Sequence, residues 1–231
     1  KKEFNFTWAA LNLLGKSLYS NAWAAISELV ANGLDAKATH VSVFIDARTK
    51  NDASIQIMDN GTGMRDEAID TYVNVGYDRR DYYYHSDSPT EAQNNIMGRK
   101  GIGKLAALYL SKDYYIQTKT SDSAPTTWHL ASDTHLAEKP YLILETGTDI
   151  DAIDPEWEQS PSGTLLILNH VDLTGLGEVA FNALSHNLAN HFLSSSMQSQ
   201  AIYLGLARNE KEYNEHEFHK VEKMIAFHNY A

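Results

Sequence analysis

The order of its helix-like and strand-like segments is the sequence feature that most limits which folds this chain of 231 residues can adopt. Apolar residues recur at helical spacing in 8–19 and 22–36, and they then alternate, as in a pair of strands, along 40–46 and at Ile55 and Ile57. Later segments predict helices from about residue 66, at 105–110 and at 181–192, and strands at 114–119, 126–131, 141–145, 163–168 and 201–207. This order is typical of an α+β fold, a two-layer α/β sandwich with a mostly antiparallel sheet.

Composition excludes several classes of protein. The chain has no cysteine, which excludes a disulfide framework, a thiolate zinc site, an iron–sulfur cluster and a cysteine nucleophile. No apolar stretch approaches the ~18 residues of a transmembrane helix, and the start of the chain does not resemble a signal peptide. The 19 Lys and Arg residues against 30 Asp and Glu residues give a net charge of −11, which opposes duplex binding by bulk electrostatics. We therefore expect a soluble, cytoplasmic protein with no membrane partner.

Three polar side chains share one face of the helix predicted over residues 22–36. At about 100° per residue, Asn32 and Asp35 lie within roughly 40° of Glu28 around the helix axis. A carboxylate in this setting can activate or orient a water, and the neighbouring amide oxygen can bind Mg²⁺, which prefers oxygen ligands. The alternative interpretation is the ordinary solvated face of an amphipathic helix.

A glycine-containing turn, Asp59-Asn60-Gly61-Thr62-Gly63-Met64, directly follows the second apolar strand. The dipeptide Asn60-Gly61 by itself is typical of an ordinary turn. In the longer string, the two glycines allow the backbone to approach a flat ligand and Met64 offers an adaptable apolar wall. Asp59 can accept a hydrogen bond from an exocyclic amine. These are the requirements of an adenine pocket.

A second glycine-rich segment opens the helix predicted at 105–110 and carries a local charge of +3 over residues 98–106. Backbone N–H groups at such a helix start can converge on an anion, with the positive end of the helix dipole behind them. The segment is not a P-loop, because Leu105 follows its last lysine, and it is not a Rossmann fingerprint, because it follows a polar loop. The residues that we expect to bind phosphate are Gly98, Arg99, Lys100, Gly101, Ile102, Gly103 and Lys104.

In this order, the three clusters resemble the motifs of the GHKL superfamily of ATPases, which share the Bergerat nucleotide-binding fold. A fourth match, Ser162-Gly163-Thr164, opens an apolar strand. The resemblance covers residues 8–170 and implies helices on one face of a mostly antiparallel mixed sheet, together with an ATP lid over 76–100. It also implies that the chain binds ATP and Mg²⁺.

The resemblance further implies roles for individual residues. Glu28 is the implied general base for the attacking water, Asn32 the implied Mg²⁺ ligand, and Asp59 the implied contact to adenine. Asp35 is implied to support the site from the same helix face. The other implied nucleotide contacts are Gly61, Gly63, Met64, Asn74 at the ribose or phosphate, Thr164 through water near adenine, and residues 98–104 at the phosphates.

The branch of the superfamily bears on the expected partners. Residues 13–20 and 98–106 look more like prokaryotic MORC-like and MutL-related ATPases than like the chaperone branch, and Asp35 stands where histidine kinases typically carry Lys or Arg. The resemblance thus implies Mg²⁺-dependent ATP hydrolysis that drives lid closure and homodimerisation of a larger, DNA-linked machine. Two alternatives remain open: a nucleotide-gated interaction switch with little hydrolysis, and a chaperone-type ATPase module.

The chain is expected to divide near residue 170. Residues 1–170 form the ATP-binding domain in this interpretation, and residues 171–231 form a C-terminal helix and extension of the same module. That extension is expected to lead to a missing downstream domain. We expect DNA or a protein client to contact the downstream part, because the acidic module itself opposes duplex binding.

Overall fold

A computed structural model describes residues 1–10, 21–74, 105–130, 138–148, 150–175, 178–192 and 199–222. These ranges contain all residues of the first two clusters, from Glu28 to Met64. Most of the first predicted helix, the lid at 76–100 and the phosphate-binding segment 98–104 lie outside them.

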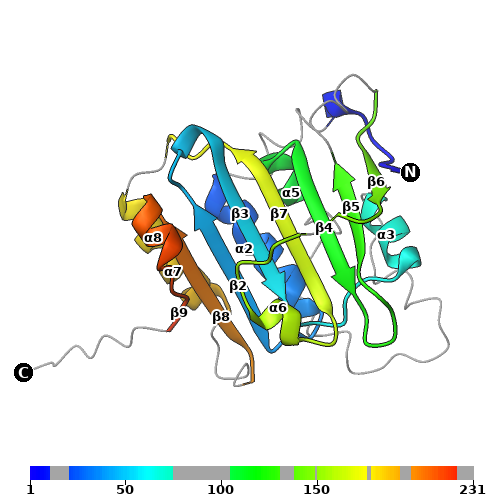
Figure 1. The fold of residues 1–231 in the computed structure, drawn as a ribbon. Helices are drawn as coiled ribbons and strands as arrows, with labels where there is room; N and C mark the ends of the chain where they lie inside the picture. Colours follow the sequence, from blue (N-terminus) through cyan, green and yellow to red (C-terminus); the bar gives the residue numbers. More distant parts are fainter. Residues whose placement is uncertain are drawn as a thin grey trace, which may run out of the picture.

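The described strands form one nine-stranded sheet in the order β1-β6-β5-β4-β7-β3-β2-β8-β9 (Figure 1). The predicted strand pair is present as β2 and β3, with Val43 opposite Ile57. Only the β2–β8 pair is parallel within the described sheet, so the prediction of a mostly antiparallel mixed sheet is confirmed. The strands are β1 (Lys2–Glu3), β2 (His40–Asp46), β3 (Ala53–Asp59), β4 (Asp113–Lys119), β5 (Thr126–Leu130), β6 (Tyr141–Glu145), β7 (Gly163–Val171), β8 (Ala201–Ala207) and β9 (His219–Lys220).

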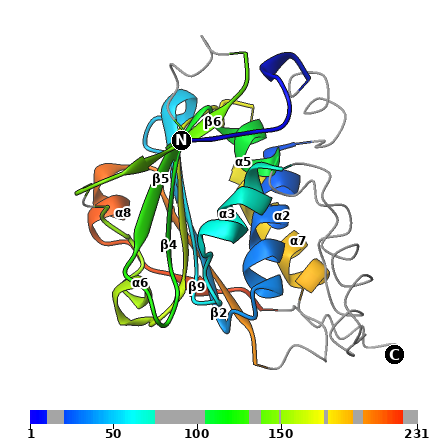
Figure 2. The same cartoon turned by 90° about the vertical axis from the view of Figure 1, so that its right-hand side faces the viewer.

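Helices cover the two faces of the sheet unequally (Figure 2). One face carries α2 (Ala22–Asp35), α3 (Asp66–Val73), α5 (Leu105–Leu110) and α7 (Glu178–Phe192), and the other carries the short α6 (Glu156–Gln159) and α8 (Glu210–Asn214). The two-layer α+β sandwich is confirmed, and the two short helices on the second face are an addition to it. Among the described helices, none combines the length and the apolar character needed to cross a membrane.

The main core lies between the sheet and α2. Alternate residues of β2 are fully buried there, namely Val41, Val43 and Ile45. A smaller core on the opposite face contains Met58, Trp157 and Leu165. Because successive strand residues point to opposite faces, Ile57 joins the main core while its neighbour Met58 joins the smaller one.

Helix α2 begins at a capped N-terminus. Asn21 Oδ1 accepts a hydrogen bond from the backbone N–H of Ala24 at 3.0 Å, which satisfies one of the free donors of the first turn. Buried apolar residues follow at helical spacing, and the helix ends at Asp35. The helix therefore presents Asn32 to solvent while its apolar residues face the core.

The segment after residue 170 completes the sheet. β8 pairs in parallel with β2 over its whole length, and α7 lies on the α2 side. Periodicity did not predict α8 and β9, because five and two residues are too few for a repeating pattern to show. The division of the chain near residue 170 stays a prediction.

Candidate functional site

Helix α2 comes very close to the end of β3 at Gly33. A Cβ atom on Gly33 would lie 2.9 Å from the Cβ of Asp59 and 3.2 Å from Cγ2 of Val41, so a residue with a side chain does not fit without a shift. This contact brings the helix segment that carries Asn32 to the turn that begins at Asp59. The sequence interpretation assigned no role to Gly33, although a glycine inside an apolar helix is a signal of close packing.

The turn Asp59–Met64 bridges the end of α2 and the start of β7. The backbone N–H of Thr62 donates to Ala36 O at 3.0 Å, just beyond the end of the helix. Ser162 Oγ, which lies just before β7, donates to Gly61 O at 2.7 Å. The first bond joins the turn to the helix that carries the first cluster, and the second joins it to the Ser162–Thr164 match.

The second half of the turn is held against β4. Gly63 has a left-handed φ of 69°, and a Cβ atom there would overlap the backbone carbonyl oxygen of Lys119. The backbone N–H of Met64 donates to Thr118 Oγ1 at 2.7 Å, and that hydroxyl donates to Gly163 O at 3.1 Å. Thr118 is therefore a further residue that shapes the turn, and no local pattern in the sequence distinguishes it from any other strand threonine.

Asp59 is the buried carboxylate of the site, with 9% of its surface exposed. Burial raises the pKa of Asp59 from 3.8 to about 6, while hydrogen bonds from the backbone N–H groups of Gly61 and Thr164 act in the opposite direction. The Gly61 donor lies 2.8 Å from Oδ1. At a pH above 6 the carboxylate is ionised, and it can accept a hydrogen bond from an amine of a ligand.

The polar residues of α2 belong to the helix that packs on this carboxylate. Asn32 is exposed, while Glu28 and Asp35 are half-buried. The described residues contain no cluster of three His, Asp or Glu that could hold a metal ion by itself. The Asn32 amide nevertheless fits Mg²⁺, which prefers oxygen ligands and commonly takes most of them from substrate phosphates and water.

Thr164 and Asn74 lie in different surroundings. Thr164 pairs with Asp59 in the β3–β7 ladder, and its backbone N–H donates to the Asp59 carboxylate. Asn74 is exposed at the C-terminal end of α3, where its Nδ2 donates to Asp70 O at 2.8 Å. Its contact to ribose or phosphate stays a prediction, as do the contacts of residues 98–104, which lie outside the described residues.

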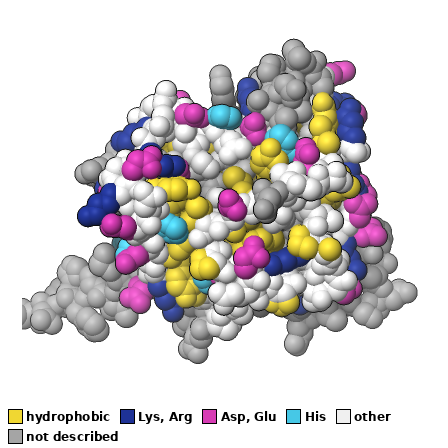
Figure 3. All heavy atoms as spheres, viewed as in Figure 1, with side chains coloured by type: hydrophobic (Ala, Val, Ile, Leu, Met, Phe, Trp, Pro, Cys, Tyr) yellow, Lys and Arg dark blue, Asp and Glu magenta, His cyan; other side chains and the backbone are white. Residues whose placement is uncertain are grey.

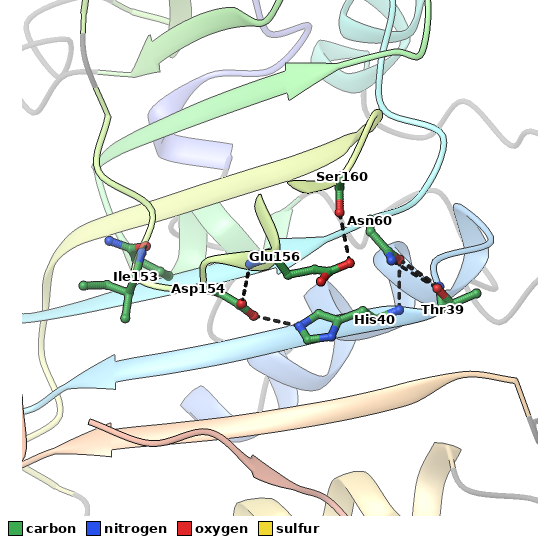
Figure 4. A network of polar contacts seen from close by, with 8 residues as sticks. Thr39, His40, Asn60, Ile153, Asp154, Glu156 and Ser160 are labelled. Carbon is green, nitrogen blue, oxygen red and sulfur yellow. Dashed lines mark hydrogen bonds and ion pairs between the residues drawn. The ribbon is translucent and has the colours of Figure 1, made fainter. Parts of the chain in front are cut away.

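Asn60 fixes the turn to the start of β2 (Figure 4). Its Oδ1 accepts hydrogen bonds from the backbone N–H groups of Thr39 and His40, both at 2.9 Å. Its Nδ2 donates to Thr39 Oγ1 at 3.1 Å, and its backbone N–H donates to His40 O at 3.1 Å. The sequence indicated only an ordinary turn at Asn60-Gly61, because a partner 21 residues away leaves no local signal.

The site combines a buried carboxylate, a glycine-containing turn and a helix face with polar side chains. A comparison of the sequence with known protein families agrees with this combination. The family described as "Histidine kinase-, DNA gyrase B-, and HSP90-like ATPase" matches residues 19–164, more than half of the chain. The chain belongs to this ATPase family. The match confirms the GHKL resemblance, and a domain of this family supports ATP binding and hydrolysis in general.

Two curated proteins are similar in sequence to parts of this chain. A putative type II restriction enzyme, HgiDII, from Herpetosiphon aurantiacus is 39% identical over 105 residues, which cover 45% of this chain and 16% of the relative. The chaperone protein HtpG from Wigglesworthia glossinidia brevipalpis is 27% identical over 183 residues, which cover 70% of this chain and 28% of the relative. The chain matches less than a third of the length of either relative. The closer likeness to MORC-like and MutL-related ATPases stays a prediction.

Proposed function

We propose that this chain is a Mg²⁺-dependent ATPase module that binds ATP beside the junction of α2 and the Asp59–Met64 turn. The observation that carries the proposal is the close approach of α2 to Asp59 at Gly33, which joins the helix bearing Glu28 and Asn32 to a buried carboxylate. Membership of the ATPase family supports ATP as the ligand.

Asp59 is the adenine-binding residue in this proposal. Its ionised carboxylate accepts a hydrogen bond from the exocyclic amine of the base. Gly61 and Gly63 let the backbone lie close to the flat base, and Met64 forms an apolar wall. Thr164 contacts the adenine end through water.

Glu28 is the proposed general base. Its carboxylate orients a water toward the γ-phosphorus and accepts a proton from it, while the new P–O bond forms and the bond to ADP breaks. Asn32 would hold Mg²⁺, which supplies positive charge next to the phosphate oxygens when it is bound. Asp35 supports the site from the same helix, and Asn74 and residues 98–104 contact the ribose and the phosphates.

The proposed output of the cycle is mechanical. ATP binding closes the segment 76–100 over the nucleotide and brings two copies of the chain together. Because the chain matches less than a third of either curated relative, we propose that it is one module of a longer cytoplasmic protein. The name of the restriction-enzyme relative supports a DNA-linked protein, with the client contacted outside this module.

Replacing Glu28 by glutamine tests the catalytic assignment. We expect Glu28→Gln to lower ATP turnover by about 10²- to 10⁴-fold, the usual contribution of a general base, while the Kd for ATP changes little. Turnover is measured by phosphate release and binding by titration calorimetry. The control is Glu67→Gln, an exposed carboxylate on α3, which should leave both unchanged. Lost binding with normal turnover per bound ATP would overturn the assignment.

Measurements on the same purified protein distinguish an ATPase from a nucleotide-gated switch with little hydrolysis. Oligomer mass is measured by light scattering with ATP and with ADP, beside steady-state turnover. ATP-dependent dimer formation together with turnover supports the proposal. Dimer formation without turnover, equal in the wild type and in Glu28→Gln, contradicts the role of Glu28.

A further inference from the structure

A segment on the face of the sheet opposite α2 lies directly behind the proposed adenine site. Residues 150–160, called the strap here, cross this face and include α6 (Figure 1). Trp157 of the strap is 2% exposed and packs against Met58 and Leu165. These two residues are the chain neighbours of Asp59 and Thr164, so the strap covers the reverse side of the strand ends that carry the site.

Further contacts hold the strap on the sheet independently of any charge. The backbone N–H of Ile153 donates to Gln56 Oε1 at 2.9 Å, and Trp157 Nε1 donates to Gln117 Oε1 at 3.0 Å. Acidic side chains are scattered between apolar ones over this face (Figure 3). Gln56 Nε2 also donates to Asp151 O at 3.2 Å, so the strap has an apolar anchor and several neutral hydrogen bonds before its buried carboxylate is considered.

That carboxylate belongs to Asp154, which is 6% exposed. Its Oδ2 lies 2.7 Å from His40 Nε2, and its Oδ1 accepts a hydrogen bond from the backbone N–H of Glu156 at 2.9 Å (Figure 4). Burial pushes the pKa of Asp154 upward, but hydrogen bonds from His40, Ser42 and the Glu156 amide outweigh it and hold the pKa below 3.8. The carboxylate is therefore ionised and directed at His40.

His40 connects Asp154 to the proposed site. Its ring is stacked on that of Tyr203, with centroids 4.4 Å apart, so the side chain is held from two sides. Its backbone N–H and carbonyl oxygen both bond to Asn60, the residue after Asp59. A continuous path of contacts therefore runs from Asp154 through His40 and Asn60 to the adenine-binding carboxylate.

We propose that Asp154 and His40 are positioning residues, which set nucleotide affinity by holding the Asp59 turn from the far side of the sheet. This inference rests on the proposed function. Burying a carboxylate beside an imidazole is an expensive route to stability, because the desolvation of both groups offsets their attraction. The strap is already anchored by Trp157 and Gln56, so the polar pair acts chiefly on the geometry of the turn. Glu28 lies on α2, across the sheet, and its chemistry stays unaffected.

The test compares Asp154→Ala with Asp151→Ala, an exposed carboxylate of the same strap. Kd for ATP and kcat at saturating ATP are measured at a temperature where circular dichroism shows each variant folded. We expect Asp154→Ala to weaken ATP binding about two- to thirtyfold, the range of coupling seen for residues that act through others, with kcat unchanged. Asp151→Ala should leave both constants unchanged. A lowered Tm with an unchanged Kd would overturn the proposal, because that is the result of a purely structural role.

Three more variants show whether the effect passes through His40. His40→Ala should weaken binding as much as Asp154→Ala, and the double variant should be no weaker than either; additive losses would contradict the path. Asp154→Asn should recover much of the affinity, because its amide can form a hydrogen bond with His40 Nε2 while its oxygen accepts from the backbone N–H of Glu156. If Asp154→Ala does not fold, His40→Ala decides the question by the same constants.

The outcomes also separate this inference from the proposed function. If the wild type binds ATP, Asp59→Asn abolishes binding and Asp154→Ala binds as the wild type does, only the inference fails. If the wild type does not bind ATP, the proposed function itself fails.

Discussion

The buried Asp59 carboxylate should make the protein less stable without nucleotide, and its replacement by asparagine should show this. Folding raises the pKa of Asp59 from 3.8 to about 6. A carboxyl group whose pKa is raised stabilises the folded state when protonated; this contribution is complete below pH 3.8 and is lost as the pH rises through 6. At 1.36 kcal/mol per pKa unit, the ionised group costs about 3 kcal/mol at pH 8.

Asp59→Asn removes the charge at every pH, so the cost should disappear. Without nucleotide, we expect the variant to be more stable than the wild type by up to about 3 kcal/mol at pH 8 and by about half as much at pH 5. At pH 8, nucleotide should nearly cancel this difference. ATP at about 100 times its Kd adds about 2.7 kcal/mol to the wild type, and it should add nothing to a variant that cannot bind adenine.

The assay is urea denaturation at pH 5 and pH 8, with and without ATP, followed by tryptophan fluorescence. The exposed Asp151 is the matched control, because Asp151→Asn removes a charge without relieving a buried one. Two results would refute the reasoning. One is a variant no more stable than the wild type at pH 8 without nucleotide, and the other is a gain that is equal at both pH values.

Two further predictions concern the backbone. Gly63→Ala and Gly147→Ala both place a side chain at a left-handed φ, which costs about 1 kcal/mol, but nothing surrounds Gly147 within 4 Å. Gly63→Ala must also displace the Lys119 carbonyl, so its loss of unfolding free energy in urea should exceed that of Gly147→Ala by at least about 2 kcal/mol; equal losses would contradict the tight turn. Asn21→Ala removes the cap of the core helix α2 and should lower the global unfolding free energy by about 1 kcal/mol. Asn209→Ala removes the equivalent cap of α8 and should speed hydrogen exchange only locally, and a global loss there would show that α8 belongs to the cooperative core.

The sequence predicted the local elements well. The alternation of Val41, Val43 and Ile45 predicted β2, and these residues are fully buried on one face of the strand. The spacing of Glu28, Asn32 and Asp35 predicted a shared helix face, and all three lie on α2. Such patterns are readable because backbone geometry repeats every two residues in a strand and every 3.6 in a helix, so a few neighbours carry the signal.

Such short-range patterns do not predict contacts between segments that are far apart in the sequence. Asn60 was interpreted as part of a turn, yet its partners are Thr39 and His40. Periodicity predicts no helix in the strap, because the four residues of α6 are too few to show a period. The phosphate-binding assignment for residues 98–104 lies outside the described residues and stays a prediction.

The sequence by itself determined the kinds of element, their order and the chemical groups offered to a nucleotide, because these depend on residue type and short-range periodicity. Only the tertiary structure decided that Gly33 lies against Asp59, that β8 runs parallel to β2, and that Asp154 contacts His40. These contacts between distant segments depend on how the whole chain packs its core and excludes water from it. A buried carboxylate with a raised pKa arises from that packing, because the same residue in a solvated turn would keep its ordinary pKa.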